Sequence, residues 1–163
     1  MDITIKKMET EDEVRGKAYV HWKSWCETYR GIVTDDYLEN VHTYERCLSR
    51  VGPFGEAKID VAKDGDRVVG FVCYGPSDEV PGAGEIHGLY LLEAYQGKRI
   101  GLLLMDHAFE RMKEYDKIIL WAFKDNKKAL DFYEKYGFHA DGEEHEYVFG
   151  KPAIGIRMVY ERK

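Results

Sequence analysis

A short polar loop between two apolar stretches is the part of the sequence best suited to binding an anion. Its six residues are Gln96, Gly97, Lys98, Arg99, Ile100 and Gly101. Residues 85–92 form a short apolar run typical of a buried strand, and residues 100–114 carry Leu104, Ala108 and Met112 on one helical face. Two cations at a helix N-terminus are unfavourable by about 0.3–1 kcal/mol each, unless an anion binds there. We interpret the loop as a phosphate-binding site made by backbone N–H groups. The alternative is a tight turn with solvated cations.

Composition limits the class of protein. The 163 residues predict one domain, residues 1–163, with enough length for a substantial core. Apolar residues make up 44% and charged residues 33%, as in soluble globular proteins. No apolar run approaches the roughly 20 residues of a membrane span, and the first residues lack the apolar region of a signal peptide. We therefore expect no membrane partner.

Charge and cysteine content narrow the choice further. The net charge of −6 argues against a nucleic-acid partner and modestly favours a cationic substrate. Cys26, Cys47 and Cys73 are odd in number and widely spaced, which fits neither a disulfide framework nor a zinc site. The six histidines show no metal-ligand spacing. We expect a cytoplasmic protein with no metal.

The remaining chain predicts the elements that would position the loop. A capping-box pattern at Thr10 and Glu13 opens a helix that runs to about residue 29, where Gly31 would end it. Further helices are predicted at 35–50, 100–114 and 127–136, a turn at 52–55, and strands at 2–7, 58–62, 67–74, 85–92, 117–122, 147–149 and 154–160. A hairpin meander thus leads into a β-α-β-α unit, which predicts an α/β (mixed α+β) fold with a mixed sheet.

Two motifs in this order resemble the signatures of the GCN5-related N-acetyltransferases (GNAT). Residues 96–101 resemble the acyl-CoA pyrophosphate loop of that family, Gln/Arg-x-x-Gly-x-Gly/Ala, and residues 126–138 resemble its Asn…Ala-x-x-Phe-Tyr-Glu-Lys-x-Gly-Phe signature. The 25 residues between Gly101 and Asn126 suit one helix and one strand. Residues 25–32, together with Tyr37 and Leu38, look like the first two helices of a bacterial branch, so the resemblance covers nearly the whole chain. It implies one domain with a mostly antiparallel mixed sheet flanked by helices and a β-α-β-α coenzyme-binding core.

One position departs from the family pattern. Arg99 stands where the pattern prefers glycine. If the backbone there has a positive φ, arginine costs about 1 kcal/mol or more. We expect coenzyme binding to be retained, with altered affinity.

The resemblance implies transfer of an acetyl group from acetyl-CoA directly to a primary amine of a small molecule, in a ternary complex. The backbone N–H groups of residues 96–101 would hold the pyrophosphate. Leu89, Tyr90 and Leu91 would pair with the pantetheine arm, and an N–H of this strand end would polarise the thioester carbonyl. Asn126 would cap its helix and bond the coenzyme.

The resemblance also suggests the catalytic residues. Tyr133 is the candidate general acid, because a phenol of pKa about 10 stays protonated at neutral pH; the alternative is a tyrosine that only packs the helix. Glu85 is the candidate general base, and strict alternation places it on one strand face with His87 and Leu89. The alternatives are an exposed carboxylate at Glu85, His87 as the base, or a water chain.

The acceptor side is the least specified. Trp25, Tyr29 and His21 would lie along one helix face over the acceptor site, and His87 is a further candidate for the substrate pocket. The amine could be a polyamine, an aminoglycoside-like amine, an amino acid or a peptide. Two other functions stay open: a non-catalytic acyl-CoA-binding sensor or subunit, and a protein N-terminal acetyltransferase. The sequence also leaves a homodimer open.

Overall fold

Seven strands form one mixed sheet in this computed structural model, which describes residues 1–50 and 57–162. The strand order is β1-β2-β3-β4-β5-β7-β6, and every neighbouring pair is antiparallel except β4 and β5. The mostly antiparallel mixed sheet that we expected is confirmed. The turn predicted at residues 52–55 lies outside the described residues.

The element bounds follow the sequence patterns closely in the centre of the chain. The strands are β1 (Ile3–Lys7), β2 (Lys58–Asp64), β3 (Arg67–Pro76), β4 (Gly84–Leu91), β5 (Lys117–Phe123), β6 (His139–Val148) and β7 (Pro152–Glu161). The helices are α1 (Glu11–Thr28), α2 (Asp35–Asn40), α3 (Tyr44–Ser49), η1 (Glu93–Tyr95, a 3₁₀ turn), α4 (Ile100–Arg111) and α5 (Lys127–Tyr136). None of these helices combines the length and the apolar composition needed to cross a membrane, within the part of the chain that is described.

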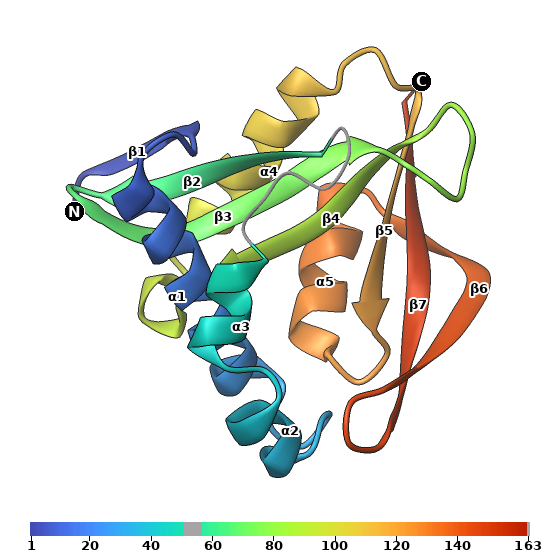
Figure 1. The fold of residues 1–163 in the computed structure, drawn as a ribbon. Helices are drawn as coiled ribbons and strands as arrows, with labels where there is room; N and C mark the ends of the chain where they lie inside the picture. The colour runs from blue at the N-terminus through green and yellow to red at the C-terminus, as the bar shows by residue number, and fades with distance from the viewer. Residues whose placement is uncertain (51–56, 163) are drawn as a thin grey trace.

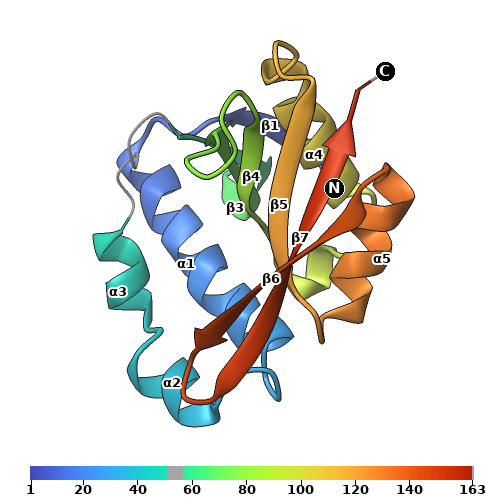
Figure 2. The same cartoon turned by 90° about the vertical axis from the view of Figure 1, so that its right-hand side faces the viewer.

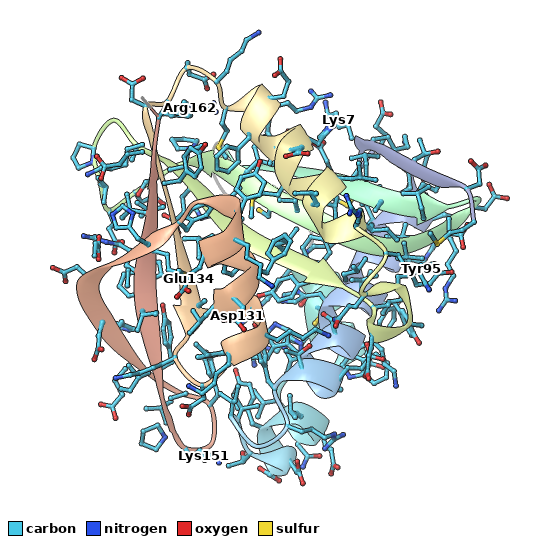
Figure 3. The ribbon with its side chains drawn as sticks, turned by 180° about the vertical axis from the view of Figure 1, so that it is seen from behind. Lys7, Tyr95, Asp131, Glu134, Lys151 and Arg162 are labelled. Atoms are coloured by element: carbon cyan, nitrogen blue, oxygen red, sulfur yellow. The ribbon has the colours of Figure 1, made fainter. Side chains whose placement is uncertain are left out.

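Helices cover both faces of the sheet. Helices α1, α2 and α3 lie on one face, and α4 and α5 on the other, as the side view shows (Figure 2). The apolar face predicted for residues 100–114 is buried against the sheet, with Leu104 and Ala108 fully buried and Met112 1% exposed. Seen from behind, α4 and α5 cover the sheet, and Asp131 and Glu134 lie on the outer side of α5 (Figure 3).

Strands β4 and β5 pair over a short distance only. Their parallel register runs from Gly84 opposite Ile118 to Ile86 opposite Leu120, although β4 continues to Leu91 and β5 to Phe123. Beyond Ile86 the two strands diverge, and α5 lies behind the opening between them (Figure 1). The edge of β4 that faces this opening therefore has no partner strand there.

A β-bulge at His87 changes which side chains share a face. Ile86 pairs with Tyr74 and Gly88 with Cys73, so His87 is the extra residue. Our prediction that Glu85 and Leu89 share a strand face is therefore wrong. Past the bulge the alternation shifts by one residue, and Tyr90 takes the face of Glu85.

Two predicted elements differ from the structure for local reasons. The single helix predicted at residues 35–50 is two helices, because the Thr43 side chain accepts the N–H of Arg46 and starts a new helix, α3. The strand predicted at 147–149 is the end of the much longer β6. Almost all residues of this edge strand are exposed, so β6 lacks the apolar alternation that identifies a half-buried strand.

A buried carboxylate fixes α4 to the sheet. Asp60 on β2 is 1% exposed and accepts a hydrogen bond of 2.6 Å from the Tyr74 hydroxyl on β3. The Nε2 atom of His107, on α4, lies 3.0 Å from the same carboxylate oxygen. This contact helps to set the position of α4, and with it the start of that helix.

A second buried carboxylate fixes the start of α1. The predicted capping box is confirmed: Glu13 receives the backbone N–H of Thr10, and the Thr10 side chain receives that of Glu13. Glu13 is 3% exposed and is paired with Lys6 at 2.7 Å and Lys63 at 3.1 Å. Burial alone would raise the pKa of Glu13, but the hydrogen bonds from Lys6, the backbone and Lys63 outweigh it and hold this pKa far below its usual range.

Replacing this carboxylate should destabilise the protein in a pH-dependent way. Because the folded-state pKa of Glu13 is lowered, its contribution is complete above the unfolded pKa near 4.3 and is lost as the pH falls below it. We expect Glu13→Gln to reduce the free energy of unfolding by about 2 kcal/mol at pH 7 and by less at pH 3, measured by denaturant unfolding. Glu11→Gln is the control, since Glu11 lies in the same helical turn and its side chain is 81% exposed. Equal effects of the two substitutions at pH 7 would contradict this account.

Candidate active site

The divergence of β4 and β5 opens a cleft of about 900 Å³. The end of β4, the following loop, the first turn of α4, α5 and the end of α1 all contribute to its wall. Of the site residues predicted from the sequence, those that line the cleft are Tyr29, His87, Leu89, Tyr90, Leu91, Gln96, Gly97, Arg99, Gly101, Asn126 and Tyr133. The cleft thus brings together the predicted coenzyme loop, the predicted acid and one of the two predicted bases.

Four predicted site residues do not line the cleft. Lys98 is exposed, and Ile100 is 1% exposed and packs in the core at the start of α4. Glu85 pairs with His87, which does line the cleft. Trp25 packs into an aromatic cluster, with its ring stacked on His42 at 4.3 Å and edge-on to Tyr29 at 4.8 Å. We expected Trp25 over the acceptor site, whereas in the structure its ring packs in this cluster and does not line the cleft.

The loop before α4 presents unpaired backbone N–H groups to the cleft. Helix α4 has no side-chain cap at its N-terminus, and its first residue is Ile100. Arg99 has φ 65° and ψ 12°, and it is the one non-glycine residue with positive φ among the described residues. Gly97 also has a positive φ of 76°. The backbone therefore adopts the left-handed conformation at the position where the family pattern prefers glycine.

Three hydrogen bonds hold this loop in place. The hydroxyl of Tyr95, in η1, donates to Asp64 Oδ2 at 2.8 Å and so joins the loop to the end of β2. Gln96 Nε2 donates to the Leu91 carbonyl at 3.3 Å, and Gln96 Oε1 accepts from Lys128 Nζ at 2.6 Å. The Gln96 side chain therefore connects β4, the loop and α5.

Positive charge gathers at this end of the cleft, although the chain as a whole is acidic. Arg99, Lys128 and Lys135 all line the cleft, against the two carboxylates of Glu27 and Glu93. The sequence reasoning missed the two lysines. Their spacing of seven residues places them on one face of α5, and this basic face close to the glycine loop is the signal that could have found them.

Asn126 has the predicted capping role. Its Oδ1 accepts the backbone N–H of Ala129 at 3.3 Å, at the start of α5. Because Asn126 also lines the cleft, its side-chain amide is available to a bound ligand. The ligand role stays a prediction.

Tyr133 lies on the inner face of α5 and is 9% exposed. Burial, together with the nearby Tyr90, raises the pKa of Tyr133 well above its usual value. Its hydroxyl makes no hydrogen bond to any described residue. Tyr133 is therefore a neutral phenol whose proton is available to a group bound in the cleft.

Glu85 and His87 form a pair at the bulge of β4. His87 Nδ1 lies 3.4 Å from Glu85 Oε2, and their side chains are 27% and 15% exposed. The hydrogen bond to Glu85 raises the pKa of His87, and partial burial opposes this only in part. Since His87 lines the cleft and Glu85 does not, His87 is the member that can reach a substrate.

Comparison with known proteins agrees with this geometry. The family model described as "Acetyltransferase (GNAT) family" matches residues 19–138. The chain belongs to the GNAT family. A protein of Mycobacterium tuberculosis named "Probable N-acetyltransferase" is 30% identical over 150 residues, which cover 86% of this chain and 81% of that protein. The enzyme is thus an acyltransferase.

Other GNAT relatives add detail about ligands. The spermidine N(1)-acetyltransferase of Thermoplasma acidophilum is 26% identical over 151 residues, covering 86% of this GNAT chain and 91% of that protein. The crystal structure of the PaiA N-acetyltransferase from the same organism, in complex with coenzyme A, has a TM-score of 0.78 and 25% identity over 99% of both chains. A coenzyme A complex of so similar a fold is consistent with the use of acetyl-CoA by this GNAT enzyme.

Arg99 gives a direct test of the loop geometry. We expect Arg99→Gly to raise the free energy of unfolding by about 1 kcal/mol, because glycine relieves the left-handed strain. Arg99→Ala removes the same charge but keeps a Cβ, so it should bring no such gain. Both variants should bind coenzyme A more weakly and with less dependence on salt. Denaturant unfolding and calorimetry measure the two effects, and equal stability of the glycine and alanine variants would contradict the strain.

Proposed function

We propose that this enzyme is an N-acetyltransferase, formed by a single domain spanning residues 1–163, that moves an acetyl group from acetyl-CoA directly to a primary amine of a small molecule. The observation that carries the proposal is the cleft between β4 and β5. It is lined by an anion-binding loop, by a neutral phenol and by the imidazole of His87, which pairs with Glu85 outside the cleft wall. These are the parts that acyl transfer between a coenzyme thioester and an amine requires.

The residues around the loop fit the coenzyme. The backbone N–H groups of residues 96–101 bind the pyrophosphate, and the charges of Arg99, Lys128 and Lys135 complement its phosphates. The edge of β4 at Leu89, Tyr90 and Leu91 has no partner strand on the side of β5, so its backbone groups pair with the amides of the pantetheine arm. Acetyl-CoA supplies an activated acyl group and a thiolate leaving group.

The remaining residues handle the protons. A backbone N–H at the end of β4 donates to the thioester oxygen and stabilises negative charge that develops there. His87, oriented by Glu85, removes the proton of the ammonium form of the acceptor before the nitrogen attacks the acyl carbon. Tyr133 donates a proton to the sulfur as the carbon–sulfur bond breaks, and the proton that the nitrogen loses after the attack restores the phenol. The acceptor and the coenzyme occupy the cleft together, so no acyl-enzyme forms.

The acceptor is proposed to be an amine with a further positive charge, such as a polyamine. A second hollow of about 380 Å³ adjoins the cleft, and Trp121 lines both. Three carboxylates, Glu79, Glu143 and Glu144, line this hollow. Arg157 pairs with Glu79 at 3.3 Å and Lys124 with Glu144 at 3.5 Å, and Glu143 has no ion-pair partner among the described residues. Glu79 accepts the Trp121 indole N–H at 2.9 Å, which leaves an aromatic face beside the acidic groups. The spermidine acetyltransferase among the relatives supports the same class of acceptor.

A thiol-release assay over an amine panel tests the function and the acid together. We expect free thiol and acetylated product with polyamines, and intersecting initial-rate lines, as a ternary complex requires. Tyr133→Phe should lower kcat by about 10²–10⁴-fold, the usual worth of a general acid, with little change in coenzyme affinity. Phe132→Leu, on the neighbouring cleft residue, is the control for packing. Coenzyme binding without thiol release across the panel would indicate the non-catalytic sensor, and activity on peptides alone would indicate a protein N-terminal acetyltransferase.

The pH profile identifies the base. His87 accepts a proton only when neutral, and Glu85 raises its pKa, so activity should fall as the pH drops through a pKa above 6.5. Glu85→Gln removes the carboxylate that raises the pKa of His87, so the acidic limb of kcat/KM should move to lower pH. His87→Gln should remove this limb. The wild type and both variants act on the same amine, whose titration affects all of them equally. Differences between their pH profiles therefore arise from the Glu85–His87 pair. If Glu85→Gln abolishes the limb while His87→Gln leaves it in place, Glu85 is the base instead.

A further inference from the structure

Three metal-ligating side chains meet outside the cleft, where α1 packs against the segment that holds α3. They are His21 on α1, His42 just before α3, and Cys47 on α3. One donor atom from each lies within 4.8 Å of the other two. His42 is 6% exposed and Cys47 is 1% exposed. The catalytic residues proposed above do not include any of the three, so the acetyl-transfer reaction does not explain them.

The imidazole of His42 lies against the Cys47 sulfur, with Nε2 at 3.6 Å and Nδ1 at 4.0 Å from Sγ. The Nε2 atom also lies 3.2 Å from the backbone carbonyl of His21, so this nitrogen carries the proton and donates it. The lone pair is then on Nδ1, and the ring must turn to direct this lone pair at a metal shared with Cys47 Sγ. The ring of Trp25 stacks on His42 at 4.3 Å. Histidine ligands in metal sites commonly donate their second nitrogen to a carbonyl in this way.

His21 contributes a buried nitrogen that lacks a partner. Within the described residues, its Nδ1 makes no hydrogen bond although it is shielded from solvent. Burial, together with the nearby Lys17, lowers the pKa of His21 to about 3. The ring is therefore neutral at physiological pH, as a metal ligand must be. Burial also raises the pKa of Cys47 to about 11, so without a metal this side chain is a thiol.

We propose that His21, His42 and Cys47 form a three-coordinate site for copper(I). One thiolate and two imidazoles are soft and intermediate donors, the set that copper(I) favours. At metal–ligand bonds of about 2.0–2.3 Å, a trigonal site needs nitrogen–sulfur separations of about 3.7 Å, and the two ring nitrogens of His42 lie 3.6 Å and 4.0 Å from Cys47 Sγ. Binding replaces the Cys47 proton by the metal and releases one proton to solvent.

Charge favours copper(I) over zinc in this position. With a single thiolate, copper(I) gives a neutral centre, whereas zinc(II) leaves one positive charge. Lys17 is buried one helical turn before His21 on α1, so an added positive charge in this buried place is disfavoured. Zinc also requires a fourth ligand, and the cluster holds three donors among the described residues.

Competition with a chromophoric copper(I) chelator, under anaerobic reducing conditions and with the full-length, tag-free protein, tests the site. We expect one copper(I) per chain, the release of one proton on binding, and a higher thermal midpoint for the loaded protein. Cys47→Ser should weaken binding at least about 100-fold, the upper range for the loss of a ligand or its support. Cys73→Ser is the matched control, because Cys73 is also a free cysteine whose pKa burial raises to about 11. It should bind copper as the wild type does.

His42→Gln is the second variant and should lose the site in the same way, provided that its metal-free unfolding transition matches that of the wild type. Equal copper binding by wild type and Cys47→Ser overturns the proposal, as does loss of binding in Cys73→Ser. Tighter binding of zinc than of copper(I), with the same dependence on Cys47, overturns the assignment to copper. All these measurements are independent of acetyl transfer, so the copper site and the enzymatic function stand or fail separately.

Discussion

The site depends on one constraint: β4 and β5 are held together at one end and kept apart at the other. Three residue pairs join them in parallel, and no pairing follows Ile86. The bulge at His87 lies one residue beyond the last pair, where a bulge bends and twists its strand. A Cβ at Gly88 would lie 2.9 Å from the Tyr90 ring, so glycine there lets Tyr90 turn toward the cleft. The same short segment thus ends the pairing, displays His87 and exposes a row of unpaired backbone groups.

Cations and carboxylates are distributed unevenly between the cleft and the adjoining hollow, which the net charge of the chain does not reveal. The cleft wall carries three cations, Arg99, Lys128 and Lys135, with Glu27 and Glu93. The adjoining hollow carries three carboxylates, two of them in ion pairs with Arg157 and Lys124. Opposite charges at the two ends attract an anionic coenzyme and a cationic acceptor to different places, which keeps each out of the site of the other. The left-handed Arg99 belongs to this division, because it adds a positive charge to the loop at the expense of backbone strain.

The sequence predicted the parts of the site that depend on local chemistry. The glycine loop, the capping roles of Thr10 and Asn126, and the bounds of α5 follow from short-range patterns, and the structure has them. The features that were missed depend on packing between distant segments. A bulge has no signature in a run of alternating residues, so the face of Leu89 was predicted wrongly. Likewise, His21, His42 and Cys47 meet only because α3 folds back on α1, which no sequence spacing reveals.

Buried phenols line the inner cleft and determine which protonation state of the acceptor amine is favoured there. Tyr29, Tyr90 and Tyr133 all line it, and burial raises the pKa of each, so the inner wall is neutral throughout the physiological range. A neutral, poorly hydrated wall disfavours an ammonium ion more strongly than an amine. In the proposed reaction the acceptor must therefore lose its proton before it reaches Tyr133. The Glu85–His87 pair stands at the bulge where β4 leaves β5, and the pKa of His87 is raised toward that of an amine. The pair therefore removes the proton at the bulge, and acyl transfer follows further along β4. The neutral wall favours the neutral amine as the nucleophile, and it also keeps Tyr133 protonated as the acid.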